Sequence, residues 1–193
     1  PPGEPLAHAV TPAFESLATF YGPQKARPSH IVELDLLSLT PFQRALLVLD
    51  GTVTKFIEAY TLEAIDVVKL AQRVEPLQES GALLDLQPGA SIISRHVLLR
   101  GQESSTVYAQ ASSLIVPHRL APDMREQLEK DGEGIGRILR DRRVETYREV
   151  LWYGKERTPA DIADAVGTEC ISRAYRILMG GEPVMRINER FPL

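Results

Sequence analysis

The spacing of apolar residues predicts two short helices early in the chain. Thr40 followed by Pro41 is typical of a helix start, and apolar residues then recur at helical spacing over 41–49. Asp50-Gly51 interrupts this pattern, and helical spacing resumes over 52–60. The sequence therefore predicts two consecutive amphipathic helices with a glycine break between them.

Alternating and β-branched stretches predict six strands. They cover 65–74, 91–99, 106–116, 144–153, 171–179 and 183–191. The polar, glycine-containing connections at 100–104 and 180–182 are typical of hairpin turns. Because the strands come as hairpins instead of alternating with helices, the pattern predicts an α+β fold in which helices flank an antiparallel sheet.

The rest of the chain gives weaker patterns. We expect a short helix within 13–20, a short strand at 31–36, a loop at 76–88 and helices at 122–130 and 137–142, while 154–169 has no clear pattern. Residues 1–29 hold six prolines and are expected to be a lead-in. Residues 30–193 contain no linker or repeat, so we expect them to form one domain.

Composition narrows the classes of function. The chain has 193 residues, 25% of them charged, and a net charge of −4, which is ordinary for a soluble globular protein and too acidic for a typical nucleic-acid binder. The one cysteine excludes an internal disulfide, and the four histidines lack metal-ligand spacing. No stretch resembles a signal peptide or a membrane span. We therefore expect a cytoplasmic protein without nucleic-acid or membrane partners and without a metal.

Strand alternation places three charges on faces that should be buried. Arg95 alternates with Ile93 and Val97, while Glu189 and Arg173 also share faces with apolar neighbours. An isolated buried charge costs several kcal/mol. Arg95 and Glu189 could form a buried ion pair, or these charges could reach water at strand ends. Alternatively, the arginine could bind a ligand carboxylate. The glutamate could then accept a hydrogen bond from a ligand hydroxyl or transfer a proton.

Other candidates are weaker. The glycines at 132–136 lack the dinucleotide-binding spacing because position 137 is arginine, so they indicate either an anion site at a helix start or a simple helix break. His96 falls on the face opposite Arg95, and Cys170 is expected to be a buried apolar residue. The alternate face of the last strand and the basic run 137–143 are both predicted to be solvated. They contribute Arg186, Asn188 and Arg190, and Arg137 to Arg143.

Five sequence blocks resemble the chorismate lyase-like superfamily. They are DGTVTKFIEA at 50–59, RHVLL at 95–99, GIGR at 134–137, SRAYRI at 172–177 and NERFP at 188–192. Their order and rough spacing match the superfamily over about residues 30–193. The pattern is most similar to the divergent branch of small lyases that form 4-hydroxybenzoate.

This resemblance implies a single six-stranded antiparallel sheet, with the ligand buried between the sheet and helical flaps. It also implies conversion of chorismate to 4-hydroxybenzoate and pyruvate without a cofactor. The family's carboxylate-binding arginine corresponds to Arg95, and the glutamate at the ring hydroxyl corresponds to Glu189. Two main-chain N–H contacts correspond to Val53 and Ile135.

The second carboxylate of chorismate, on its enolpyruvyl group, is expected to meet Arg173 or Lys55. The same fold also serves as the sensing domain of some transcription regulators. A domain that binds an aromatic acid without catalysis is therefore the alternative, and a lyase for another chorismate-like compound is a third reading.

Overall fold

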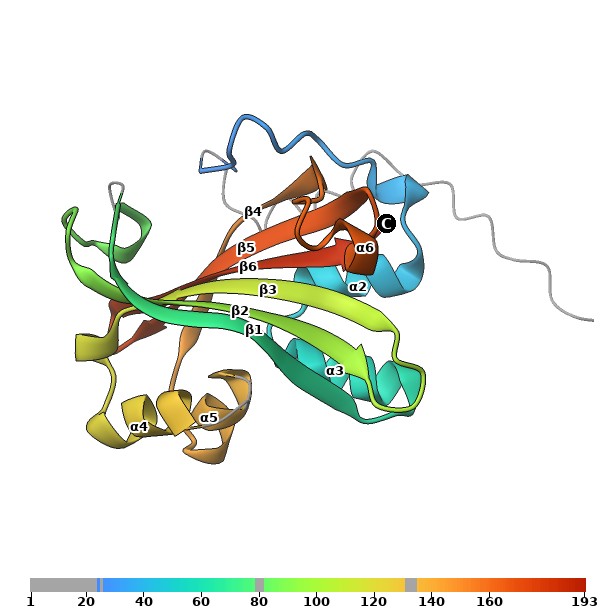
Figure 1. The fold of residues 1–193 in the computed structure, drawn as a ribbon. Coiled ribbons are helices and arrows are strands. Elements are labelled where there is room, and N and C mark those ends of the chain that lie inside the picture. The colour runs from blue at the N-terminus through green and yellow to red at the C-terminus, as the bar shows by residue number, and fades with distance from the viewer. Residues whose placement is uncertain (1–23, 25, 79–81, 131–134) are drawn as a thin grey trace, which may run out of the picture.

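A six-stranded antiparallel sheet forms the centre of the computed structural model, which describes residues 24, 26–78, 82–130 and 135–193. The strands lie in the order β1-β2-β3-β6-β5-β4 (Figure 1). Their bounds are β1 Ile65–Pro76, β2 Ser91–Gly101, β3 Val107–Ile115, β4 Tyr147–Arg157, β5 Glu169–Met179 and β6 Glu182–Pro192. The predicted α+β class and all six predicted strands are confirmed.

The helices are short and flank this sheet. They are α2 Pro41–Val48, α3 Val53–Thr61, α4 Pro122–Lys130, α5 Ile135–Asp141 and α6 Ala163–Val166, with single 3-10 turns η1 Leu36–Ser38, η2 Ala82–Leu84 and η3 Pro117–Arg119. The predicted start of α2 is confirmed by a capping box, in which Thr40 and Gln43 satisfy each other's main-chain N–H groups. No helix in the described part of the chain is long and apolar enough to cross a membrane.

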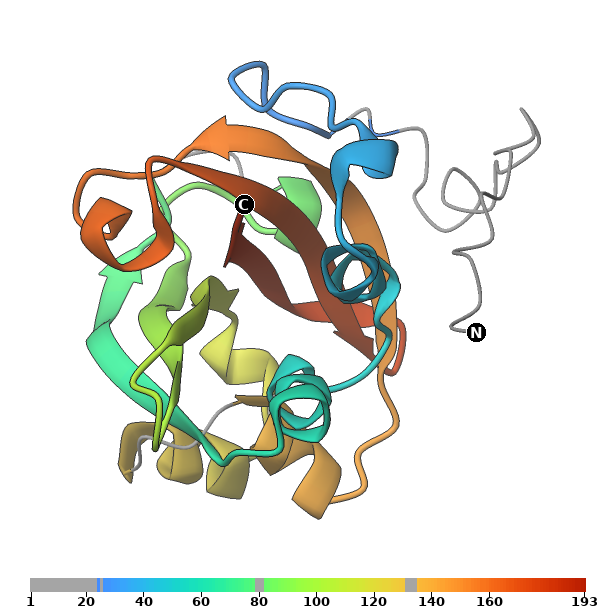
Figure 2. The same cartoon turned by 90° about the vertical axis from the view of Figure 1, so that its right-hand side faces the viewer.

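Two helix pairs cover opposite ends of one sheet face, which we call the inner face. The pair α2–α3 packs at one end through Leu46, Leu47 and Ile57, and the pair α4–α5 packs at the other through Leu128 and Ile138 (Figure 1). The sheet curls around these helices (Figure 2). The apolar core is thus divided into two clusters, and the middle of the inner face lies between them.

The outer face is also largely covered, so the prediction of a solvated face on the last strand is wrong. Asn188 is buried and accepts a hydrogen bond from Ser172 at 3.0 Å, and Arg190 donates to Glu156 at 2.8 Å. Arg186 lies over the Trp152 ring, 5.7 Å from its centroid. Apolar side chains from segments outside the sheet cause this burial, among them Ile31, Leu83, Ile162 and Val166.

Three local expectations change. The strand expected at 31–36 is only one bridge, Val32 with Lys155, because Asp35 caps the turn η1 by accepting from the Leu37 N–H. The helix expected from 137 begins at Ile135, and the unassigned stretch 154–169 contains the end of β4 followed by α6. The helix expected at 13–20 lies outside the described residues.

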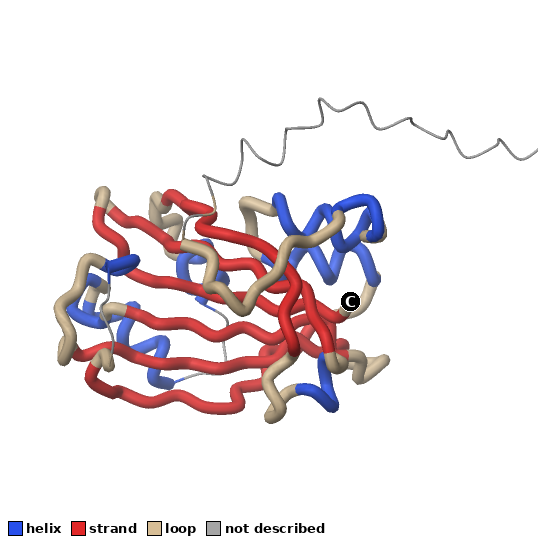
Figure 3. The backbone as a smooth tube through the Cα atoms, turned by 90° about the horizontal axis from the view of Figure 1, so that it is seen from above, coloured by secondary structure: helices blue, strands red, loops and turns tan. Residues whose placement is uncertain are grey.

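Long hairpins and short helical connections are evident when the chain is seen from above (Figure 3).

Gly154 marks a close approach between β4 and the segment before α2. A Cβ atom at this position would lie 2.5 Å from Ile31 Cγ2 and 2.6 Å from the main-chain oxygen of Val32. Overpacking of this kind forces backbone shifts. We predict that Gly154→Ala lowers the free energy of unfolding by about 2 kcal/mol, measured by urea unfolding. Gly51→Ala is the control, since its Cβ would meet only Leu49 at 3.7 Å; equal losses in both variants would contradict the prediction.

Glu63 ties the end of α3 to the β2–β3 hairpin. Its carboxylate accepts from the Tyr108 hydroxyl at 2.7 Å, from the Ser104 hydroxyl at 2.8 Å and from the Ser104 N–H at 3.1 Å. These hydrogen bonds, that from Tyr108 first, lower the pKa of Glu63 from 4.5 to about 2. The ionised carboxylate is therefore favoured by folding.

We predict that this contact makes the free energy of unfolding depend on pH in the acidic range. A carboxyl whose folded pKa is depressed contributes stability above its unfolded pKa and loses it as pH falls through the folded value. The contribution should therefore fade between pH 4.5 and about pH 2. Glu63→Gln should lower stability at neutral pH and flatten the decline in that window, measured by denaturant unfolding at several pH values. Glu103→Gln on the same turn should keep the wild-type slope; an unchanged slope in Glu63→Gln would refute the assignment.

Candidate functional site

The middle of the inner face carries the charges that strand alternation placed inward. Arg95, Arg173 and Glu189 are all buried, with exposed fractions of 2%, 1% and 5%. Arg95 and Glu189 line a cavity on this face, and Arg173 lies against the end of α2. Their inward placement is confirmed, and the suggestion that they reach water at strand ends is wrong.

Arg95 is held by the neighbouring strand. The register of β1 and β2 places Gln72 directly opposite Arg95, and the Arg95 guanidinium donates to Gln72 Oε1 at 2.6 Å. Burial lowers the pKa of Arg95. The hydrogen bond to Gln72 therefore fixes the direction of the Arg95 guanidinium on the inner face of the sheet.

Glu189 pairs with Arg173, so the alternative of an Arg95–Glu189 ion pair is not formed. Arg173 Nη2 donates to Glu189 Oε2 at 2.5 Å, and its Nε donates to the same oxygen at 3.2 Å. Arg173 Nη1 also donates to the main-chain oxygens of Leu46 and Leu49, at 2.5 and 3.0 Å. These carbonyls lie at the end of α2, where helix carbonyls lack partners within the helix. Arg173 therefore fixes both Glu189 and α2.

Arg95 and Glu189 are separated by β3, and two small residues occupy the gap. The register places Ser113 opposite Arg95 and Ala111 opposite Glu189. All four residues line one cavity of about 80 Å³, which we call the inner cavity. The arrangement gives a space with an arginine on one side, a glutamate on the other and little side-chain volume between them.

Tyr175 completes the hydrogen bonding of Glu189. Its hydroxyl donates to Glu189 Oε1 at 3.0 Å, so each carboxylate oxygen has a partner. Burial, with a further contribution from the Glu189 charge, raises the pKa of Tyr175. The hydroxyl therefore stays protonated and keeps donating to the carboxylate.

Two helix starts meet at the wall of the inner cavity. Val53 is the first residue of α3, and Thr52 before it makes no side-chain cap, so the first N–H groups of α3 are not satisfied by a capping side chain. Ile135 is the first residue of α5, and a Cβ on the next residue, Gly136, would lie 3.2 Å from Thr52 Cγ2. The two positions expected to supply main-chain donors therefore begin neighbouring helices.

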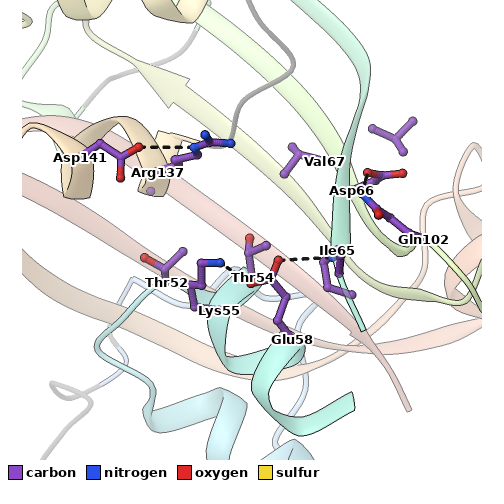
Figure 4. A pocket seen from close by; sticks show the side chains of 13 residues that line it. Thr52, Thr54, Lys55, Glu58, Ile65, Asp66, Val67, Gln102, Arg137 and Asp141 are labelled. Carbon is purple, nitrogen blue, oxygen red and sulfur yellow. Dashed lines mark hydrogen bonds and ion pairs between the residues drawn. The ribbon is translucent and has the colours of Figure 1, made fainter. Parts of the chain in front are cut away.

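Lys55 lies in a separate outer pocket of about 760 Å³, whose lining shares Thr52, Thr54, Val67 and Gly136 with the inner cavity (Figure 4). Lys55 Nζ pairs with Glu58 Oε2 at 2.6 Å. Arg173 lines neither space. The structure thus does not bring Lys55 and Arg173 together, and it separates both from the inner cavity.

The remaining candidates from the sequence do not join this site. His96 lies on the outer face, where its ring nitrogens contact the hydroxyls of Ser94 and Ser112. Cys170 is buried, as predicted, and burial raises the pKa of its thiol. The described residues contain no group of three or more potential metal ligands. The described arginines of the basic run, Arg137, Arg142 and Arg143, are exposed.

Sequence reasoning missed Gln72 and Arg148. Gln72 could be found only from the register, since a bulge between Lys69 and Ala71 shifts the alternation of β1. Arg148 on β4 also lines the inner cavity. It alternates with Val144 and Val150, so the test that found Arg95 would have found it as well.

Comparison with known proteins places this chain in a family. Residues 47–193 match the family model described as chorismate pyruvate-lyase Rv2949c-like, and the chain belongs to this family. A chorismate pyruvate-lyase of Mycobacterium leprae is 31% identical over 154 residues, covering 77% of this chain and 72% of that protein. One from Mycobacterium tuberculosis is 25% identical over 158 residues, covering 77% and 78%.

Solved structures share the fold at low sequence identity. The effector domain of PhnF from Mycobacterium smegmatis matches with a TM-score of 0.59 and 14% identity, covering 74% of this chain and 88% of that one. The C-terminal domain of Yurk from Bacillus subtilis matches with a TM-score of 0.51 and 10% identity, covering 65% and 88%. The fold is therefore the one used by chorismate lyases and by effector domains of this kind.

The Arg173–Glu189 pair gives a direct test of the site's framework. Removing one partner of a buried ion pair costs about 3–5 kcal/mol, because the other charge stays buried. We predict this loss for Arg173→Met in urea unfolding. Adding Glu189→Gln should recover part of it, giving a coupling energy of about 1–3 kcal/mol in the double-mutant cycle.

Arg176 offers a matched control for this cycle. It lies on the same strand, but its partner Glu149 is 40% exposed in its side chain. Arg176→Met should therefore cost less than about 1 kcal/mol. Strictly additive effects of the Arg173 and Glu189 substitutions would contradict the proposed framework.

Proposed function

We propose that this protein cleaves chorismate to 4-hydroxybenzoate and pyruvate. The observation that carries the proposal is the placement of Arg95 and Glu189 across the inner cavity from each other, in a chain that belongs to a chorismate pyruvate-lyase family. Chorismate has a ring carboxylate and a ring hydroxyl on opposite sides of its ring. A cation on one side of the cavity and an acceptor on the other match these two groups.

Arg95 binds the ring carboxylate in this proposal. A guanidinium can donate two parallel hydrogen bonds to a carboxylate, which fixes the orientation of the ring. The N–H groups of Val53 and Ile135, at the starts of α3 and α5, add oriented donors. Positioning by such fixed donors lowers the barrier without any cost of reorganisation during the reaction.

Glu189 accepts a hydrogen bond from the ring hydroxyl in this proposal. Arg173 and Tyr175 already bond to its two oxygens, and each carboxylate oxygen has lone pairs for a second donor. The reaction breaks the ether C–O bond, and the electron pair leaves with the enolpyruvyl oxygen. The ring carbon that bears the hydroxyl loses its proton, which makes the ring aromatic, and the enolate released from the ether takes up one proton at its methylene carbon to become pyruvate. Atoms balance without a cofactor.

The inner cavity must widen to hold the ring. Its volume of about 80 Å³ is well below that of typical ligand pockets, which hold roughly 300 Å³ or more. The wall that it shares with the outer pocket includes Thr52 and Gly136, at the two helix starts. Small separation of these helix starts joins the two spaces, and their closing again excludes water from the bound ring.

The alternative is a domain that binds an aromatic acid without catalysis. It is favoured by the structural neighbours, one of which is described as an effector domain. The two functions need the same carboxylate-binding arginine, so binding alone does not separate them. Turnover does.

We predict that the protein releases pyruvate and 4-hydroxybenzoate in equal amounts from chorismate, followed by a coupled pyruvate assay and by chromatography. Arg95→Ala should lower kcat/KM by about a hundredfold or more, since an oriented charged donor is lost. Arg100→Ala is the control, because Arg100 lies on the same strand with an exposed side chain. Binding of 4-hydroxybenzoate without any turnover would overturn the lyase proposal in favour of the sensor.

A further inference from the structure

One arginine at the inner cavity has an unsatisfied donor. In the described part of the chain, four side chains keep a buried nitrogen or oxygen without a hydrogen-bond partner: Arg125, Arg148, Trp152 and Thr158. Only Arg148 among them lines the inner cavity, and its unpartnered atom is the guanidinium Nε. Leaving a charged donor buried and unpaired is costly unless something else completes its hydrogen bonds.

The position of Arg148 is set by β4. It lies opposite Ile177 of β5, on the edge strand of the sheet, and its charge lowers the pKa of Tyr175. Because the sheet curls, β4 rises along one side of the inner face (Figure 2). Arg148 therefore lines the inner cavity from β4, while Arg95 lines it from β2, on the other side of the central strands.

The charges of the described lining are unequal. Arg95 and Arg148 are positive, and Glu189 is the one acidic side chain of the lining. The charge of Glu189 is paired with that of Arg173, which does not line the cavity. Within the described lining, two arginines therefore face one carboxylate that is already paired with Arg173. Such an excess favours a ligand that carries more than one negative charge.

We propose that Arg148 binds a second carboxylate of the ligand, the one on the enolpyruvyl group if the ligand is chorismate. This inference rests on the proposed function for the identity of the ligand. The other two candidates for this role are occupied elsewhere: Arg173 donates to Glu189 and to main-chain oxygens, and Lys55 pairs with Glu58 in the outer pocket. A planar guanidinium is well suited to a carboxylate, which it can grip with two hydrogen bonds.

The proposal separates the roles of the two arginines. The product 4-hydroxybenzoate keeps the ring carboxylate and lacks the second one. Arg95 should therefore contribute to binding of both substrate and product, while Arg148 should contribute to binding of the substrate alone. A purely structural role for Arg148 would not distinguish these two ligands.

The test compares Arg148→Gln with Arg95→Gln. We expect Arg148→Gln to raise KM for chorismate and lower kcat/KM by about tenfold to a hundredfold, the range for a hydrogen bond to a charged group. The Kd for 4-hydroxybenzoate, measured by calorimetry, should stay within about twofold of the wild-type value, whereas Arg95→Gln should weaken it by at least about tenfold. Arg148→Lys, which keeps the charge, should recover part of the loss in kcat/KM.

A matched control and a binding arm keep the outcomes distinct. Arg157→Gln, at the exposed end of β4, should leave all constants unchanged. Suppose that wild type turns chorismate over. If Arg148→Gln then keeps kcat/KM within twofold, or weakens the binding of 4-hydroxybenzoate as much as the binding of chorismate, the role of Arg148 is refuted and the lyase function stands. If wild type binds chorismate without turnover, the lyase function falls, and a chorismate Kd that weakens selectively in Arg148→Gln still supports the second carboxylate site. If wild type does not bind chorismate, both fail.

Discussion

The buried contact between Arg173 and Glu189 links the parts of this structure that would otherwise be independent. Arg173 stands on β5, Glu189 stands on β6, and the main-chain oxygens that complete the guanidinium belong to the end of α2. One side chain thus joins two central strands to a helix. The pair also explains how a carboxylate can face a cavity in the middle of an apolar core, since its charge is compensated before any ligand arrives.

The division of the core follows from the helices. Because α2–α3 and α4–α5 each bury their own end of the inner face, a small cavity remains between them, with a mostly apolar lining into which Arg95, Arg148 and Glu189 are set. On the outer face, short segments cover part of the sheet, and the Ser172 hydroxyl donates to Asn188 Oδ1 there. The same sheet therefore holds a few buried charges in an apolar setting on one face and a partly covered polar layer on the other.

Much of this could be predicted from the sequence, because its signals are local. Alternation gave the six strands and placed Arg95, Arg173 and Glu189 inward, and Thr40-Pro41 marked the start of α2. The pairing of the charges could not be predicted, because it depends on the strand order: β3 separates Arg95 from Glu189, while Arg173 is directly opposite Glu189. The prediction of a solvated outer face on β6 was wrong for a similar reason, since Trp152 and the segment around Ile31 cover that face from distant parts of the chain.

The small side chains of Ala111 and Ser113 have a consequence for how relatives of this chain should be compared. They leave the space between Arg95 and Glu189 open without contributing any charge. A larger apolar residue at either position would close the cavity while every arginine and glutamate stayed in place. Chains that keep all the charged positions can therefore differ in whether they have room for a ring, and the two residues of β3 are the place to look for that difference.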